Sequence, residues 1–135
     1  MSGARPLQLI LARNLVSSLS TPAFLVDADG NLLFFNEAAG VLLGRRYEET
    51  GQMTAVEWTS TFGPFDEEGR PMPFEDVPLT AALRGNRASH GGFHIRSVNG
   101  VDHAIEASAL PLVGENSFHG AMVVFWPKGE PEPGA

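Results

Sequence analysis

The chain has 135 residues, of which 43% are hydrophobic and 19% charged, and this composition suits one folded domain of ordinary size. Its net charge of −7 would repel a nucleic-acid backbone, and its lack of cysteine excludes disulfides, thiolate metal sites and thiol nucleophiles. No apolar run is long enough to span a membrane and no signal peptide is visible, so we expect a cytoplasmic protein.

Residues 6–19 predict a helix, because Pro6 suits the first helical position and leucines recur at intervals of four residues. A second apolar stripe begins at Leu9, so the apolar arc is wider than a helix lying on one surface needs. The helix is therefore either half buried on its own domain or a dimer helix that flanks the domain over residues 1–19. The candidate dimer residues are Leu7, Ile10, Leu11, Leu15 and Val16.

Two short apolar runs, at 23–26 and 32–35, flank a turn that contains Asp29 and Gly30. Asp-Gly between apolar runs predicts a β-hairpin, in which Gly30 has a structural role. Asn36 follows the second run and can cap a helix that continues to Leu43. We therefore interpret Asn36 as structural and expect its replacement by alanine to cost about 1 kcal/mol.

The middle of the chain, from 45 to 75, combines short helical turns with a loop rich in glycine and proline. A further helix is predicted from about 76 to 84, where Pro78 lies early and Gly85 ends the helix.

Three strands follow, at about 88–98, 102–113 and 118–126. The last strand is apolar on both faces apart from His119, which predicts a central and buried position. Residues 128–135 form a tail of proline, glycine and glutamate that we expect to be disordered. Consecutive hairpins make the sheet antiparallel, and the helical middle must cover one of its faces, which is an α+β arrangement.

Three stretches of the chain carry a family resemblance. The first is 21–39, the predicted hairpin with Asn36 and the start of the next helix. The second is 66–85, which contains D-x-x-G-x-P followed by P-L-x-x-A-L-x-G, and the third combines 105–112 with 120–125. In this order and spacing they resemble the PAS domain family of bacterial sensory and signalling modules. The resemblance covers about residues 17–126, and we assign the domain to 20–127.

The resemblance implies a five-stranded antiparallel sheet with helices packed on one face, here with an additional N-terminal flanking helix. It also implies a sensor that binds a small molecule or a protein partner and relays a signal, as a homodimer and without enzymatic activity. The relay would act on an output protein or on an output domain outside this sequence. Whether the chain stands alone or is part of a longer protein stays open.

The resemblance bears on cofactors as well. Light-sensing LOV members form a flavin adduct with a cysteine, which this chain lacks. Haem-binding members commonly place a histidine on the helix that here spans 76–84, which has none. Other histidines remain at 90, 94, 103 and 119, but we expect neither haem nor flavin.

The aromatic middle segment and the sheet could together enclose an apolar cavity for a fatty acid or another hydrophobic small molecule. The simpler interpretation of the same residues is that they fill the core, which would leave a pure interaction or dimerisation module. The candidate ligand residues are Met53, Trp58, Phe62, Phe65, Phe74, Leu79, Leu83, Ile95, Ile105 and Phe125.

A small α+β enzyme or ligand carrier is a further interpretation, but it needs a buried acid or base that the sequence does not supply. His94, His103 and His119 could meet across adjacent strands, yet no metal-binding spacing such as H-x-x-x-H occurs. We therefore expect exposed sheet histidines and no metal.

Overall fold

The structure, a computed structural model, describes residues 7–73, 76–113 and 119–129. The predicted helices and strands occur in the predicted order, and residues 130–135 of the expected tail lie outside the described ranges. The elements are α1 (Leu7–Ser18), β1 (Ala23–Asp27), β2 (Leu32–Phe35), α2 (Glu37–Leu43), α3 (Tyr47–Thr50), α4 (Ala55–Phe62), α5 (Pro78–Gly85), β3 (Ser89–Arg96), β4 (Asp102–Val113) and β5 (His119–Pro127).

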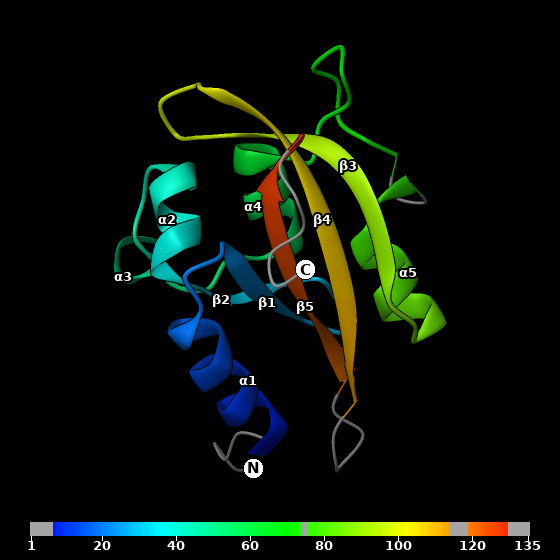
Figure 1. Cartoon of the computed structure of the whole chain (residues 1–135). Coiled ribbons are helices and arrows are strands. Elements are labelled where there is room, and N and C mark those ends of the chain that lie inside the picture. The colour runs from blue at the N-terminus through cyan, green and yellow to red at the C-terminus, as the bar shows by residue number, and fades with distance from the viewer. Residues whose placement is uncertain (1–6, 74–75, 114–118, 130–135) are drawn as a thin grey trace.

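The five strands form one antiparallel sheet in the order β2-β1-β5-β4-β3 (Figure 1). β5 lies in the middle, between β1 and β4, which confirms the position that its two apolar faces predict. Phe24 of β1 is opposite Val123 of β5, and Phe125 of β5 is opposite Ala107 of β4. These side chains therefore project from the same face of the sheet as neighbours.

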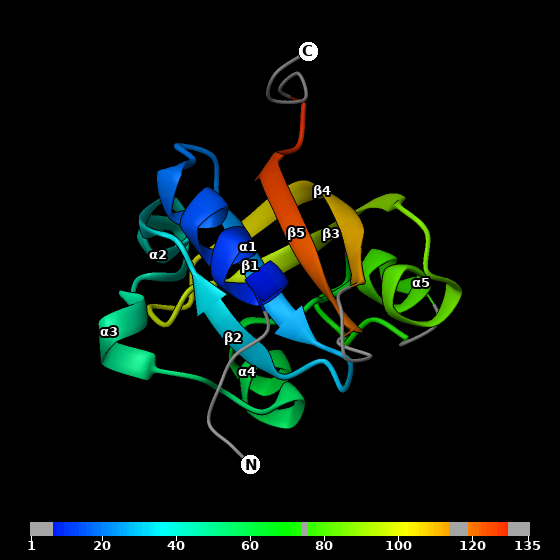
Figure 2. The ribbon, with the colours of Figure 1, turned by 90° about the horizontal axis from the view of Figure 1, so that it is seen from below.

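Alternate strand positions supply two separate cores, one on each face of the sheet. The larger core lies between the sheet and helices α2, α4 and α5, and it contains Phe35, Phe62 and Ile105. The smaller core lies beneath α1 on the opposite face, where Val16 packs against Leu25. Figure 2 shows α1 on one side of the sheet and α4 and α5 on the other. This arrangement confirms the α+β fold with a flanking N-terminal helix.

The turn from β1 to β2 is held by the Asp27 carboxylate, which accepts from the backbone N–H groups of Asp29 and Asn31 at 2.9 and 3.0 Å. Gly30 in this turn has a φ of +82°, which residues with a side chain rarely adopt. Asn36 ends β2 and begins α2, and its Oδ1 accepts from the N–H groups of Ala39 and Ala23 at 2.9 and 3.1 Å. No helix in the described part of the chain is long and apolar enough to cross a membrane.

Candidate functional site

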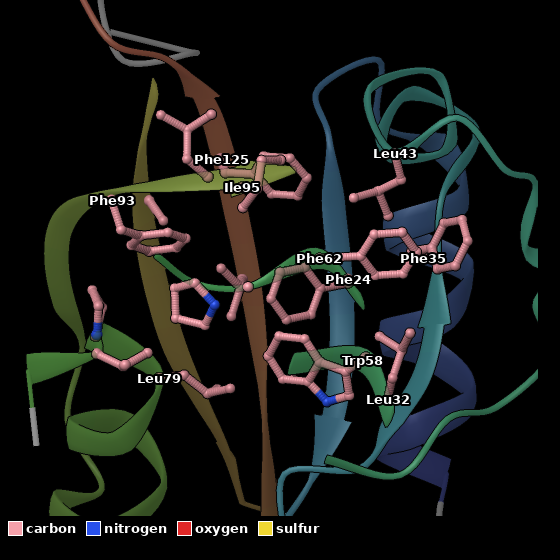
Figure 3. Close-up of a pocket in the computed structure, with 17 residues that line it drawn as sticks. Phe24, Leu32, Phe35, Leu43, Trp58, Phe62, Leu79, Phe93, Ile95 and Phe125 are labelled. Atoms are coloured by element: carbon pink, nitrogen blue, oxygen red, sulfur yellow. The ribbon is translucent and has the colours of Figure 1, made fainter. Parts of the chain in front are cut away.

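An apolar cavity of about 50 Å³ lies inside the larger core, between the sheet and helices α4 and α5. Figure 3 shows aromatic rings directed toward it from several strands and from α4. The ring of Phe24 lies 5.7 Å from that of Trp58 and 5.9 Å from that of Phe125, centroid to centroid. Elements far apart in the sequence therefore meet at this cavity.

The lining carries no charged group among the described residues, and its one side-chain polar atom is already bonded. That atom is the indole nitrogen of Trp58, which donates to the carbonyl oxygen of Gly30 at 2.7 Å. The described lining of the cavity can therefore recognise a molecule by shape and apolar contact.

The size of the cavity limits what can occupy it. A water needs roughly 10–15 Å³ of such space, whereas sites for drug-sized ligands have roughly 300–1,000 Å³. At about 50 Å³ the cavity admits only a few non-hydrogen atoms unless the surrounding side chains move.

Most of the predicted ligand residues lie at this cavity or beside it. The six that line it are Trp58, Phe62, Leu79, Ile95, Ile105 and Phe125. Phe65 and Leu83 line a neighbouring surface groove instead. Met53 pairs through its backbone with Leu32, and Phe74 lies outside the described residues.

Sequence reasoning missed a larger set of lining residues, most of which come from the sheet and from the segment between the end of α4 and the start of α5. They are Phe24, Leu32, Phe35, Leu43, Gly63, Pro64, Val77, Pro78, Phe93, Ala107 and Val123. Of these residues, the sequence pattern could have indicated only Ala107, because the alternation of β4 places it on the same face as Ile105. In β1 and β5 both faces are apolar, so the pattern does not indicate which residues face the cavity.

The two apolar stripes of α1 have different surroundings. Leu9, Ala12 and Val16 are buried against the sheet. The predicted dimer residues Leu7, Ile10, Leu11 and Leu15 are exposed, with relative exposures of 62%, 44%, 57% and 52%. Val16 has no exposure at all, so its assignment as a dimer residue is wrong: it belongs to the stripe that faces the sheet.

His94 and His103 do not meet, and the side chain of His119 lies outside the described part of the structure. His94 is opposite Ala104 in the register, so it projects from the other face of the sheet than His103. On the face of the sheet opposite the larger core, His94 and His90 each pair with a carboxylate. His94 lies 2.6 Å from Asp102, and His90 lies 3.4 Å from Glu106. Within the described ranges no three histidine, aspartate or glutamate side chains are placed to hold a metal ion.

A family model described as "PAS fold" matches residues 11–62 of the chain. No curated protein sequence matches this chain. Among solved structures, a PAS domain from Colwellia psychrerythraea is 17% identical, with a TM-score of 0.63 and coverage of 88% of this chain and 95% of that chain. The PAS domain of nitrogen regulation protein NR(II) from Vibrio parahaemolyticus is 12% identical, with a TM-score of 0.63 and coverage of 87% and 97%.

A LOV protein of Rhodobacter sphaeroides is 14% identical, with a TM-score of 0.70 and coverage of 91% of this chain and 68% of that chain. The family model and the solved structures agree on the PAS fold. The chain is therefore a protein of the PAS fold.

Proposed function

We propose that the chain is a sensory or regulatory module that binds a small apolar molecule in its core cavity and relays the binding event as a homodimer. The observation that carries this proposal is an apolar cavity lined jointly by the sheet and by helices α4 and α5. Similar structures include PAS domains of a nitrogen regulation protein and of a two-component sensor histidine kinase. An output protein or output domain outside this sequence would receive the signal.

The two central strands offer a route for the relay. Phe125 and Val123 of β5 line the cavity, while Met122 and Val124 of the same strand pack against the core beneath α1. In β1, likewise, Phe24 lines the cavity and Leu25 packs in the core beneath α1. A ligand that displaces the rings on one face would therefore shift the surface on which α1 rests.

A homodimer would bury the exposed leucines of α1. Leu7, Leu11 and Leu15 repeat at four-residue spacing along one side of the helix, and each is more than half exposed. A second chain that packs its own α1 against this stripe would remove the apolar surface from water.

A second candidate function is a dimerisation module whose core is filled. The small volume of the cavity favours it, because about 50 Å³ leaves room for few atoms. This alternative keeps the role of α1 and removes the role of the ligand.

Co-purification and thermal melting distinguish the two functions. Native mass spectrometry of the wild-type protein should detect a bound apolar molecule, and adding that molecule should raise the melting temperature. Ala107→Val fills part of the cavity from β4 and should abolish both effects. If nothing co-purifies and no small apolar compound raises the melting temperature, the ligand-binding function is refuted and the filled-core module stands.

Light scattering tests the dimer. Leu11→Glu combined with Leu15→Glu should convert a dimer to a monomer, because charges on the stripe would have to be buried. Val41→Glu on α2 is the matched control, since Val41 is an exposed apolar residue away from α1. A dimer that survives the double change, or that the control disrupts equally, would exclude the stripe as the interface.

A further inference from the structure

A second hollow adjoins the cavity, and it is larger and open to the surface. This groove has a volume of about 340 Å³ and lies between α4, α5, the β1–β2 turn and the segment that follows α4. Trp58, Pro64, Val77 and Leu79 line both the groove and the cavity. A single layer of side chains therefore separates the two spaces, and Trp58 and Leu79 are visible in that layer (Figure 3).

Among the described polar side chains of the groove, Asp29, Thr59 and Ser60 offer acceptors rather than donors, and the fourth, Thr80, is buried and already has an interaction of its own. Thr59 and Ser60 already donate their hydroxyl hydrogens to the carbonyl oxygens of Ala55 and Val56, both at 2.6 Å. Their oxygens therefore present only lone pairs to a ligand. The indole N–H of Trp58 is likewise used by Gly30. The charged lining residue among those described is Asp29, whose carboxylate accepts hydrogen bonds only.

These features decide which polar group of a ligand, here called its head, the groove can hold. A carboxylate or phosphate normally pairs with arginine, lysine or a free N–H donor, and the described lining of both spaces contains no cationic residue. An anionic head would instead approach Asp29 and the bonded hydroxyl oxygens. An ammonium or an alcohol can donate to all of these acceptors.

We propose that the groove is a binding subsite for the polar head of an amphipathic small molecule whose head is cationic or a neutral hydrogen-bond donor, with its apolar body directed toward the cavity. The inference rests on the proposed ligand-binding function and narrows it. It disfavours a fatty acid, because the carboxylate would lack a partner. The volume of the groove lies within the range of small-molecule sites, which the cavity alone does not reach.

Three probes with the same aromatic body test the head-group selectivity: 2-phenylethylamine, 2-phenylethanol and phenylacetate. The readout is the NMR signal of the indole N–H of Trp58, at the boundary of the two spaces. The chain's other tryptophan, Trp126, lies on the opposite face of the sheet against His90 and serves as an internal reference. At pH 7 the amine should bind about fivefold more tightly than the alcohol, and phenylacetate should bind least.

Charge reversal at Asp29 sharpens the test. Asp29→Lys should reverse the order, so that phenylacetate binds more tightly than the amine. Glu48→Lys on α3 makes the same change in net charge at a residue that lines neither space, and it should leave the order unchanged. The proposal is overturned if Asp29→Lys keeps the wild-type order, if Glu48→Lys reverses it, or if no probe shifts the Trp58 signal.

Ala107→Val separates this inference from the proposed function. If the probes keep their affinities and their dependence on Asp29 in this variant, the groove subsite stands without the cavity, and the cavity function fails. If the wild-type protein binds the probes without regard to Asp29 and Ala107→Val abolishes binding, the cavity function stands and the groove subsite fails.

Discussion

The side-chain amide of Asn36 donates a hydrogen bond to the carbonyl oxygen of Val16, 3.0 Å away, and thereby ties the end of α1 to the start of α2. The same nitrogen lies 2.8 Å from the carbonyl oxygen of Thr21. Because the Oδ1 atom caps α2 and also accepts from Ala23, one buried side chain joins α1, β1 and α2.

Asn36→Ala should lower the free energy of unfolding by about 3 kcal/mol, since it leaves several buried backbone groups without partners. This exceeds the 1 kcal/mol that a helix cap alone predicts. Urea denaturation measures the change. Asn14→Ala, at an exposed position of α1, should change the free energy by less than about 0.5 kcal/mol.

Asn36→Asp separates the capping of α2 by the side-chain oxygen from the hydrogen bonds that the side-chain nitrogen donates. Aspartate still caps α2, but it places a carboxylate against the carbonyl oxygens of Val16 and Thr21. We expect α1 to detach while the sheet persists, so the amides of α1 should exchange with deuterium faster than those of β5. Equal protection of α1 in the variant and the wild type would contradict this assignment.

Arg13 holds the middle of α1 through aromatic rings. Its guanidinium carbon lies 4.5 Å from the ring centroid of Phe34 and 5.6 Å from that of Tyr47. Arg13→Gln should cost about 1 kcal/mol in urea denaturation. Arg87→Gln, at an exposed position after α5, should be neutral, and an equal loss in both variants would argue against the ring contacts.

The architecture follows from the sequence because its signals are local and repeated. Asp29-Gly30 predicts the first hairpin, alternation in β4 predicts a half-buried strand, and a strand that is apolar on both faces predicts the centre of the sheet. Each of these signals depends on a few neighbouring residues.

The cavity could be located from sequence only in part, because its lining depends on which face of each strand is inside. Phe24 lines the cavity and Leu25 packs beneath α1, yet both belong to one uninterrupted apolar run. The same ambiguity affects α1, where Val16 and Leu15 are adjacent and only packing against the sheet decides which is buried. The cavity volume depends on how closely side chains from many elements fit together, which no sequence pattern encodes.

Two alanines of β4 allow a direct test of the cavity. Ala107 and Ala109 are both fully buried and project from the same face, but only Ala107 lines the cavity. Ala107→Val should be neutral or stabilise the fold by about 1 kcal/mol, because the added methyl groups enter empty space. Ala109→Val should destabilise it by about 1–3 kcal/mol through overpacking. Equal destabilisation by both changes in thermal melts would indicate that the cavity is closed in solution.

The last prediction concerns acid stability and the start of α4. The Glu57 carboxylate accepts from the backbone N–H of Thr54 at 2.8 Å, and the Thr54 hydroxyl accepts from the N–H of Glu57 at 3.2 Å. The hydrogen bond from the Thr54 N–H lowers the pKa of Glu57, with a further contribution from the Thr54 side chain. A lowered pKa in the folded state means that ionised Glu57 stabilises the fold above its unfolded pKa, and that this stability is lost as the pH falls through the folded value.

Glu57→Gln should therefore lower the stability at pH 7, and the difference from the wild type should shrink as the pH falls below about 4.3, the ordinary glutamate pKa. Urea denaturation of both proteins between pH 7 and pH 3 measures this difference. Glu48→Gln on α3 removes an exposed carboxylate outside this capping pair and serves as the control. A Glu57→Gln difference that stayed constant with pH would show that the ionised carboxylate does not hold the first turn of α4, and that any loss comes from the altered side chain alone.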